Sequence, residues 1–444
     1  MRGNLLTVVN YIITFLTGSK ESTEIISYSK KPDLTVPITI IDSGFFDEDN
    51  YLTEKSMPVL PLENWNGIPI LFGKDKEEII QGHYVVYADI IASSYFLLSR
   101  YEECINRTSR DEHGRFLGIF SLPYRAGFIN RPIVDEYGQQ LKLVMSKIGI
   151  VSKSIKAGIS HIYLTHDIDE IWQWNGIVSA LKTFVKRLVY NRPHKMESIL
   201  ALHNYKKNDS IYTFPYFISK YQYLKYNMLF NNVTEIYFIK GGGNTSFDNQ
   251  YYLNTKRVKD LVDFIKKNEA VVGLHASYSA GQNPSLLKEE KYFLEKMSGE
   301  SVLCNRNHYL DSREPEDMEY LINASITDDF TMGYADIAGF RLGTCRATMW
   351  INPIKIEITS LKLHPLTVMD CTLNQKDYMN LDYEDAFKVI KDLLSKICKY
   401  NGEVNLLWHN NSVAQMSKGY QRKLYDSIIQ LIGEEYNDTE EKKL

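Results

Sequence analysis

The order of apolar and polar positions divides the chain into two regions. From about residue 158 onward, short apolar runs alternate with longer stretches whose apolar residues recur at helical spacing. The runs predict strands at 162–165, 235–239, 271–274, 301–304 and 404–408, and the longer stretches predict helices at 256–267, 286–297 and 383–400. Strands that alternate with helices are typical of a parallel α/β fold, closed as a barrel or open.

The first 155 residues have a mixed pattern of their own. Apolar runs predict buried strands at 36–42 and 68–73. Apolar residues at helical spacing predict helices at 89–103 and 135–145. This region contains no phosphate loop, metal-ligand spacing or nucleophile motif. We therefore expect a smaller N-terminal α/β domain at residues 1–155 and a second α/β domain at residues 156–435. Residues 436–444 are expected to form a frayed charged tail.

The N-terminal apolar run follows Arg2 and has the length of a short signal sequence. Its apolar residues fall at helical spacing, however, polar residues interrupt the run, and no small-x-small cleavage site follows. We expect an amphipathic first helix over residues 5–16 and a cytoplasmic location. No apolar run reaches the length of about 18 residues that a membrane span needs, so we predict no span.

Composition narrows the class of function. Lys and Arg number 51 against 55 for Asp and Glu, and the formal net charge is -4. This balance argues against nucleic acid as a partner, because such binding needs a basic excess or a dense basic stripe. The five cysteines form no CxxC pair, so neither a disulfide framework nor a cysteine zinc site is indicated. A reducing compartment fits this usage.

Polar side chains follow the predicted strands, at the edge where α/β folds place their active sites. Asp167 and Asp169 come directly after the first strand of the second domain. Two carboxylates so close together are costly to hold unless a cation or a proton is shared between them. They predict one metal ligand and one general base or, alternatively, a helix N-cap with a first-turn acid.

Histidines and an arginine follow the later strands. His275 and His308 are candidate ligands for zinc or a similar divalent ion. Arg306 could hold a nearby carboxylate in its ionised form by bidentate hydrogen bonds, and His409 suits a general acid. The glycines at 241–243 lack the Lys-Ser/Thr of a phosphate loop, so we interpret them as a flexible turn.

The order of these motifs resembles that of the polysaccharide deacetylase family, also called carbohydrate esterase family four. The resemblance rests on Asp-x-Asp, His-x-Ser, Arg, Asp and a strand that ends in His, over roughly residues 158–430. It implies a distorted (β/α)7 barrel that removes N- or O-acetyl groups from sugars with a divalent metal, usually zinc. The N-terminal part resembles an uncharacterised domain that precedes such barrels in bacterial proteins, through residues 94–103 and 111–116.

The first two motifs of the family carry over residue by residue. The segment Thr-His-Asp-Ile-Asp occupies the place of the family's Thr-Phe-Asp-Asp. This implies that Asp167 is the base that activates water at the metal and that Asp169 is a metal ligand. The second motif is His-Ser/Thr-x-x-His, and His275 and Ser277 match its start. Ser279 stands where the second histidine is expected, so one ligand of the family is missing.

The remaining motifs supply the other candidates. Arg306 matches the arginine beside the base, and His308 stands where the family has proline. We expect His308 to replace the missing ligand, with His166 as the other choice. Asp329 corresponds to the fourth motif and His409 to the general acid of the fifth. Because catalytic zinc has three protein ligands, the expected set is Asp169, His275 and His308.

The resemblance implies a metal-dependent hydrolase that removes acetyl groups from an N-acetylated sugar of a glycan or glycan precursor. Its cofactor would be a divalent metal, usually zinc, and its partner a carbohydrate substrate. The side chains expected near the sugar are Ser277, Tyr278, Tyr309 and Trp408, with Trp172 as a further aromatic, although ordinary packing explains each ring equally well. Two alternatives stay open, a catalytically inactive carbohydrate-binding barrel and a hydrolase of another non-peptide C–N bond on the same fold.

Overall fold

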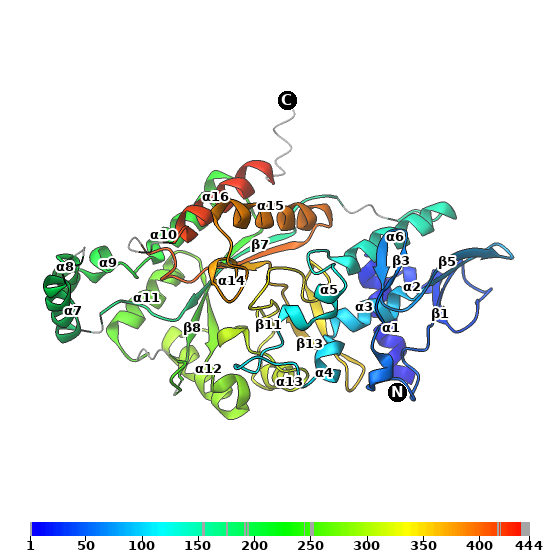
Figure 1. Cartoon of the computed structure of the whole chain (residues 1–444), viewed down its shortest axis with the longest axis horizontal. Helices are drawn as coiled ribbons and strands as arrows, with labels where there is room; N and C mark the ends of the chain where they lie inside the picture. The colour runs from blue at the N-terminus through cyan, green and yellow to red at the C-terminus, as the bar shows by residue number, and fades with distance from the viewer. Residues whose placement is uncertain are drawn as a thin grey trace. The chain divides into compact units, whose positions relative to one another are not determined.

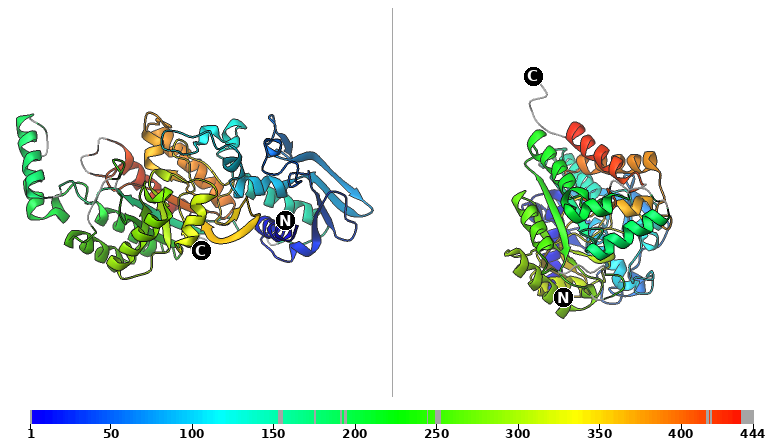
Figure 2. Two further views of the ribbon diagram at one scale, coloured as in Figure 1. Left: turned by 90° about the horizontal axis from the view of Figure 1, so that it is seen from below. Right: turned by 90° about the vertical axis from the view of Figure 1, so that its left-hand side faces the viewer.

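The structure is a computed structural model of the chain, shown in Figure 1 and Figure 2. It describes residues 2–152, 156–174, 176–190, 192, 195–243, 245–248, 253–414, 417 and 419–436. Contacts divide the chain into two compact units. The first consists of Met1–Ile159, Tyr309–Thr367 and Asp392–Val404, and the second of Ser160–His308, Val368–Lys391 and Asn405–Leu444.

This division differs from the order of domains expected along the sequence. Residues 309–367 and 392–404, which the sequence assigns to the second domain, cluster with the first unit. The predicted domain boundaries themselves stay a prediction. Most of the predicted charged tail lies outside the described residues, which end at 436. Among the helices that the structure describes, none is long and apolar enough to cross a membrane.

The first unit combines short helices with a small sheet. Its N-terminal helices are α1 (Arg2–Thr17), α2 (Ser22–Ile25), α3 (Ile90–Leu98), α4 (Tyr101–Ile105), α5 (Leu122–Arg125) and α6 (Ile133–Lys147). Its N-terminal strands are β1 (Ile26–Ser29), β2 (Ile38–Ile41), β3 (Glu63–Trp65), β4 (Ile68–Ile70), β5 (Gly73–Ile80) and β6 (His83–Ala88). Strands β1, β2, β6 and β5 form a sheet in that order, parallel except for β5 with β6. The predicted strands at 36–42 and 68–73 are confirmed as β2 and β4.

The later segments of the chain add four elements to the first unit. They are α13 (Glu316–Asn323), β11 (Asp328–Asp329), β12 (Thr348–Asn352) and β13 (Glu357–Leu363). Strand β13 pairs in parallel with β11 and antiparallel with β12.

The amphipathic first helix is confirmed, because α1 buries its apolar stripe, which includes Val9, Ile12 and Leu16. The stripe packs against α6, at a point where Gly138 meets the backbone of Leu16. A Cβ atom at position 138 would collide with the Leu16 carbonyl, so this close approach of two helices requires glycine.

The single helix predicted over 89–103 is wrong in one detail, because it is broken into α3 and α4 at Arg100, whose φ is +56°. Asp89 begins α3 as an N-cap, and its carboxylate accepts a hydrogen bond from the Ala92 amide at 2.9 Å. The left-handed residue lets the chain turn between the two helices. The break is stabilised by the ion pairs of the Arg100 guanidinium.

A buried charge network ties the α3–α4 corner to the later segments of the first unit. The Glu103 carboxylate lies between two guanidinium groups, with Arg100 Nη2 at 2.5 Å and Arg341 Nη2 at 2.8 Å. Arg100 Nη1 also lies 3.0 Å from Glu314 Oε2, and Trp350 Nε1 donates to Glu314 Oε1 at 2.7 Å. All four side chains are buried, and burial raises the pKa of Glu314 to about 8, so Glu103 is the main negative charge of the network near neutral pH. Burial alone would raise the pKa of Glu103, but the two arginines hold it at about 2.

Glu103→Gln removes the negative charge between two buried arginines. We expect it to lower the free energy of unfolding by about 3–5 kcal/mol near neutral pH, measured by urea denaturation. The low pKa of Glu103 stabilises the folded state above pH 4.5 and is lost as pH falls toward 2, so the variant should lack part of the acid sensitivity of the native chain. The exposed Glu48→Gln is the matched control. Equal stabilities of the two variants would contradict the prediction.

The second unit contains the predicted strand–helix alternation. Its strands are β7 (His161–Ile168), β8 (Val233–Lys240), β9 (Val271–Ala276), β10 (Cys304–Asn307), β14 (Val368–Met369) and β15 (Glu403–Leu407). Its helices are α7 (Ile177–Val189), α8 (Glu197–His203), α9 (Tyr205–Asn208), α10 (Phe214–Gln222), α11 (Lys256–Lys267), α12 (Pro284–Ser298), α14 (Asp370–Asn374), α15 (Tyr383–Lys399) and α16 (Gln421–Glu435). The division between the units falls within α15 and β15, whose residues from 392 to 404 cluster with the first unit. Helices α15 and α11 have nearly the predicted bounds, and α7 to α10 occupy a stretch for which the sequence predicts no element.

The strands of this unit lie in the order β10-β9-β8-β7-β15-β14. The pairs β7–β8, β8–β9, β9–β10 and β14–β15 are parallel, so their carboxyl ends meet at one edge. Helices α10 and α16 cover the same face of β7, where His166 contacts Phe217 and Tyr425 (Figure 1; Figure 2). The fold is therefore mixed α/β. The described strands do not close on themselves in this order, and the seven-stranded barrel stays a prediction.

The strand predicted at 301–304 is displaced by three residues. Strand β10 covers Cys304–Asn307, and its register places Arg306 beside His275 of β9. The polar residues of β10 can form a strand because their side chains are buried and paired rather than exposed. Arg306 therefore belongs to the sheet itself and not to the loop that follows it.

Candidate metal centre

Three side chains converge at the carboxyl edge of the parallel strands. Asp169 follows β7, His275 lies near the end of β9, and His308 follows β10. One ligand atom from each lies within 4.8 Å of the other two. Asp169 Oδ1 lies 3.1 Å from His308 Nε2 and 3.6 Å from His275 Nε2. The structure thus brings together the three residues that the sequence predicts as metal ligands, and they could hold a metal.

Hydrogen bonds to Nδ1 determine which nitrogen of each imidazole faces the cluster. His275 Nδ1 lies 2.9 Å from the Arg306 carbonyl oxygen, and His308 Nδ1 lies 3.0 Å from Asp248 Oδ1. Both oxygens can only accept, so each Nδ1 carries the proton and donates. His275 Nε2 then presents its lone pair toward Asp169, which is the tautomer that a metal ligand needs. Burial would lower the pKa of His308, but Asp169 and Asp248 raise it above its ordinary value, so a metal ion would replace a proton on His308 Nε2.

The cluster has the properties of a cation site. Asp169 Oδ1 and His275 Nε2 are buried, and neither makes a well-oriented hydrogen bond to any residue that the structure describes, although Lys240 Nζ and His308 Nε2 form ion pairs with Asp169 Oδ1 at 3.0 and 3.1 Å. Burial would raise the pKa of Asp169, but His275, His308 and Lys240 hold it well below its ordinary value. Burial lowers the pKa of His275, which favours its neutral, ligating form. One carboxylate and two imidazoles are donors that suit zinc and other divalent ions.

Arg306 holds the other carboxylate of the Asp-x-Asp pair. Its Nη1 donates to Asp167 Oδ1 at 3.0 Å and to Thr165 Oγ1 at 2.7 Å. The second oxygen of Asp167 lies 3.8 Å from His275 Nε2 and so faces the cluster. Thr165 and Asp167 lie on one face of β7, and His166 lies on the other, where its Nδ1 contacts the Trp408 carbonyl. His166 is therefore not a ligand in this structure.

His409 approaches the cluster from the strand β15 side. Its Nε2 lies 3.8 Å from Asp169 Oδ2, and its Nδ1 lies 2.7 Å from Asp370 Oδ1. Burial by itself would lower the pKa of His409, but the carboxylate of Asp370 raises it well above its ordinary value. A protonated imidazole held by a carboxylate can donate a proton, which is the chemistry predicted for this residue.

Three charged residues of the site were not predicted from the sequence. Asp248 orients His308, Asp370 orients His409, and Lys240 Nζ lies 3.0 Å from Asp169 Oδ1 with its side chain buried. Lys240 is the last residue of β8, so the rule that site residues end strands could have found it. Asp248 and Asp370 have no such signal in the sequence.

Two of the residues predicted to contact sugar have other partners within the second unit. The Ser277 hydroxyl donates to Glu290 Oε1 of α12 at 2.5 Å and contacts Ser279 at 3.2 Å. The Trp408 ring is fully buried against Tyr425 of α16, so no sugar ring can stack on it. Tyr278 is half-buried beside the Phe247 ring, and its role stays a prediction.

Two further predicted residues belong to the first unit. Asp329 accepts hydrogen bonds from the hydroxyl and the amide of Thr331, at 2.7 and 3.1 Å. The Tyr309 ring packs 4.6 Å from the His113 ring, and its φ is +61°. Their catalytic and sugar-binding roles stay predictions.

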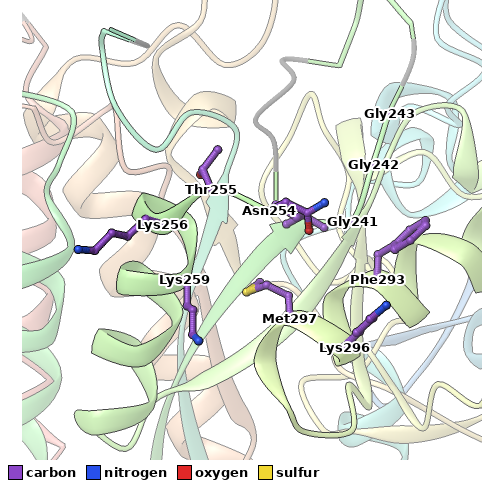
Figure 3. Close-up of a pocket in the computed structure, with 11 residues that line it drawn as sticks. Gly241, Gly242, Gly243, Asn254, Thr255, Lys256, Lys259, Phe293, Lys296 and Met297 are labelled. Carbon is purple, nitrogen blue, oxygen red and sulfur yellow. The ribbon is translucent and has the colours of Figure 1, made fainter.

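A cavity of about 840 Å³ lies beside the end of β8, as Figure 3 shows. It is lined by the glycines after β8, the first turn of α11 and residues of α12, and none of the three candidate ligands lines it. Gly241 passes so close to the Glu290 carbonyl that a Cβ atom would collide with it, and Gly243 has a φ of +115°. These glycines therefore form a tightly packed turn and not the flexible turn expected from the sequence.

Comparisons with known proteins match only part of the chain in each case. Residues 5–149 match the model of a family of unknown function, DUF7033. No curated protein matches the chain. A Mycobacterium smegmatis structure described as a "putative polysaccharide deacetylase" is 11% identical over 65% of this chain and 88% of its own, with a TM-score of 0.40. A Bordetella bronchiseptica structure described as a "putative polysaccharide deacetylase involved in o-antigen biosynthesis" is 12% identical over 64% and 86%, with a TM-score of 0.26. Values this low carry no argument about the chemistry of the site.

We expect the purified chain to bind one divalent ion, measured by calorimetric titration with zinc. Asp169→Ala and His308→Ala each remove one of the three candidate ligands and should weaken binding by about 100-fold or more. His203→Ala, at an exposed histidine of α8, is the matched control and should bind as the native chain does. Binding of equal strength in all four proteins would place the ion elsewhere.

Asp248→Asn tests the carboxylate that orients His308. The amide keeps the size of the side chain but removes the charge that holds Nδ1–H, so we expect zinc affinity to fall by about 10-fold to 100-fold. The thermal midpoint should change little, which separates loss of orientation from loss of fold. Asp263→Asn, at an exposed position of α11, makes the same change away from the site. Unchanged affinity in Asp248→Asn would contradict the prediction.

Proposed function

We propose that the chain is a metal-dependent hydrolase that removes acetyl groups from an N-acetylated sugar of a glycan or glycan precursor. The observation that carries the proposal is the convergence of one carboxylate and two imidazoles within 4.8 Å, beside a second carboxylate and a third imidazole that is paired with Asp370. The motif order supports the choice of substrate, because it resembles that of the polysaccharide deacetylases.

Each residue around the cluster has a separate role in the proposed amide hydrolysis. A divalent ion held by Asp169, His275 and His308 would supply Lewis acidity toward the acyl oxygen and toward water. Asp167, oriented by Arg306, accepts the proton of the attacking water while the water oxygen bonds to the acyl carbon. His409 donates a proton to the nitrogen as the C–N bond breaks, giving acetate and a free amine. Asp370 keeps His409 in the protonated form that this step needs.

One observation favours the alternative of a catalytically inactive carbohydrate-binding fold. The Lys240 ammonium lies 3.0 Å from Asp169 Oδ1 and provides a positive charge where a ligand carboxylate faces the cluster. A chain whose Asp169 is satisfied by lysine alone would bind no divalent ion. The zinc titration described above therefore separates the two functions.

Acetate release from N-acetylated amino-sugar oligomers, in the presence of zinc, tests the proposed reaction. Asp167→Asn and His409→Gln should each lower kcat by about 100-fold to 10,000-fold, because each removes a proton-transfer group. Both should still bind zinc, since neither residue is one of the three proposed ligands. Asp263→Asn is the control and should keep full activity.

Different failures of this experiment have different meanings. Zinc binding without acetate release from any N-acetylated sugar would favour a hydrolase of another C–N bond. Acetate release that survives both substitutions would contradict the proposed roles of Asp167 and His409.

A further inference from the structure

Helix α7 carries an apolar face that is exposed in the structure. Its exposed side chains are between 45% and 70% accessible, and they are Ile177, Val178, Leu181, Val185, Leu188 and Val189. At 3.6 residues per turn these positions fall on about one third of the circumference of the helix. Lys182 and Lys186 border this arc on one side. We call this surface the outer face of α7.

The opposite side of α7 packs against α8, which lies beside it (Figure 1). Ala180 is buried in a small cluster with Trp174 and Ala201. The Arg187 guanidinium donates to Ser198 Oγ at 3.4 Å and lies 5.5 Å from the Trp174 ring. These contacts explain the orientation of α7. They involve only its inner side, so they do not explain why its outer face is apolar.

The charged residues in the stretch of chain that contains this face are all basic, although Glu197 of α8, one residue beyond the stretch, lies 3.7 Å from Arg187. Between residues 171 and 196 the sequence has no Asp or Glu, and its basic residues are Lys182, Lys186, Arg187, Arg192 and Lys195. The whole chain has a formal net charge of -4, so this stretch is a local basic segment in an acidic protein. An apolar arc bordered by lysines is the pattern of helices that lie in the interface of anionic membranes.

We propose that the outer face of α7 docks on an anionic phospholipid surface. The apolar arc would enter the boundary between headgroups and acyl chains, while Lys182 and Lys186 would meet the lipid phosphates. Helix α7 has 13 residues, fewer than the roughly 20 needed to span a bilayer, so it lies on the surface and does not cross it. This inference does not depend on the proposed hydrolase activity.

A second copy of the chain is a less suitable occupant of the same face. Two copies of α7 packed by their outer faces would bring lysines together, and α7 itself has no carboxylate to pair with them, while Glu197 of α8 is paired with Arg187. Lipid phosphates supply the missing negative charge, which is why the membrane is the occupant that the charges favour.

Sedimentation of the full chain with lipid vesicles tests this proposal. The chain should pellet with vesicles that contain phosphatidylglycerol, should remain in solution with pure phosphatidylcholine vesicles, and should release as salt rises. Val185→Glu places a charge in the apolar arc. The double variant Lys182→Glu and Lys186→Glu reverses the sign of the charge that borders the arc. Each should reduce the pelleted fraction at least tenfold at limiting lipid.

Matched variants elsewhere on the surface keep the test specific. Lys259→Glu with Lys267→Glu makes the same change of charge on exposed positions of α11, and Ile79→Glu places a charge on an exposed apolar residue of β5. Both should pellet as the native chain does. The proposal is overturned if the native chain stays in solution with anionic vesicles, or if the α7 variants and the controls pellet alike. It is also overturned if Val185→Glu converts a dimer to a monomer in sizing experiments without any vesicle binding.

Discussion

A buried guanidinium keeps its charge, so it is tolerated only where its donors are paired, and this requirement at Arg306 organises the second unit. Its side chain is fully buried and reaches Thr165, Asp167 and Asn405, at 2.7, 3.0 and 3.3 Å. It thereby links β10 to β7 and β15. Its carbonyl oxygen also accepts from His275 Nδ1, so one residue orients both a candidate base and a candidate ligand. Loss of either role would leave buried polar groups unpaired, which is costly.

Much of this arrangement could be predicted from the sequence, because parallel strands expose their carboxyl ends together. Short apolar runs predicted the positions of β7, β8, β9 and β15, and polar residues at the ends of β7 and β9 predicted Asp169 and His275. His308 was predicted from its place after the run at 301–304. Strand β10 was misplaced because its residues are polar. Apolar periodicity cannot detect a strand whose side chains are buried through hydrogen bonds and ion pairs instead of through apolar contacts.

The residues that escaped prediction act through other residues. Asp248 and Asp370 stand in a loop and at the start of a short helix, and each makes its contribution only because the fold brings an imidazole to it. The sugar contact predicted for Trp408 is wrong for a different reason, which is the direction of its side chain. Its position at the end of a strand suggested a sugar contact, but alternation along β15 and its neighbours turns the ring toward α16. Sequence position gives the edge of a sheet more reliably than the side that a ring faces.

The discontinuity of the first unit limits how such a chain can be rearranged. Glu103 comes from the stretch that matches a family of unknown function, whereas Arg341 and Glu314 come from a segment that follows β10 more than 200 residues later. The N-terminal stretch is thus not a self-contained module. Removing the N-terminal stretch, or fusing it to a different protein, would leave buried charges unpaired in both parts of the chain. Gene fusion and domain shuffling should therefore preserve the two segments as a pair, and the N-terminal stretch should be inherited with its distant partner.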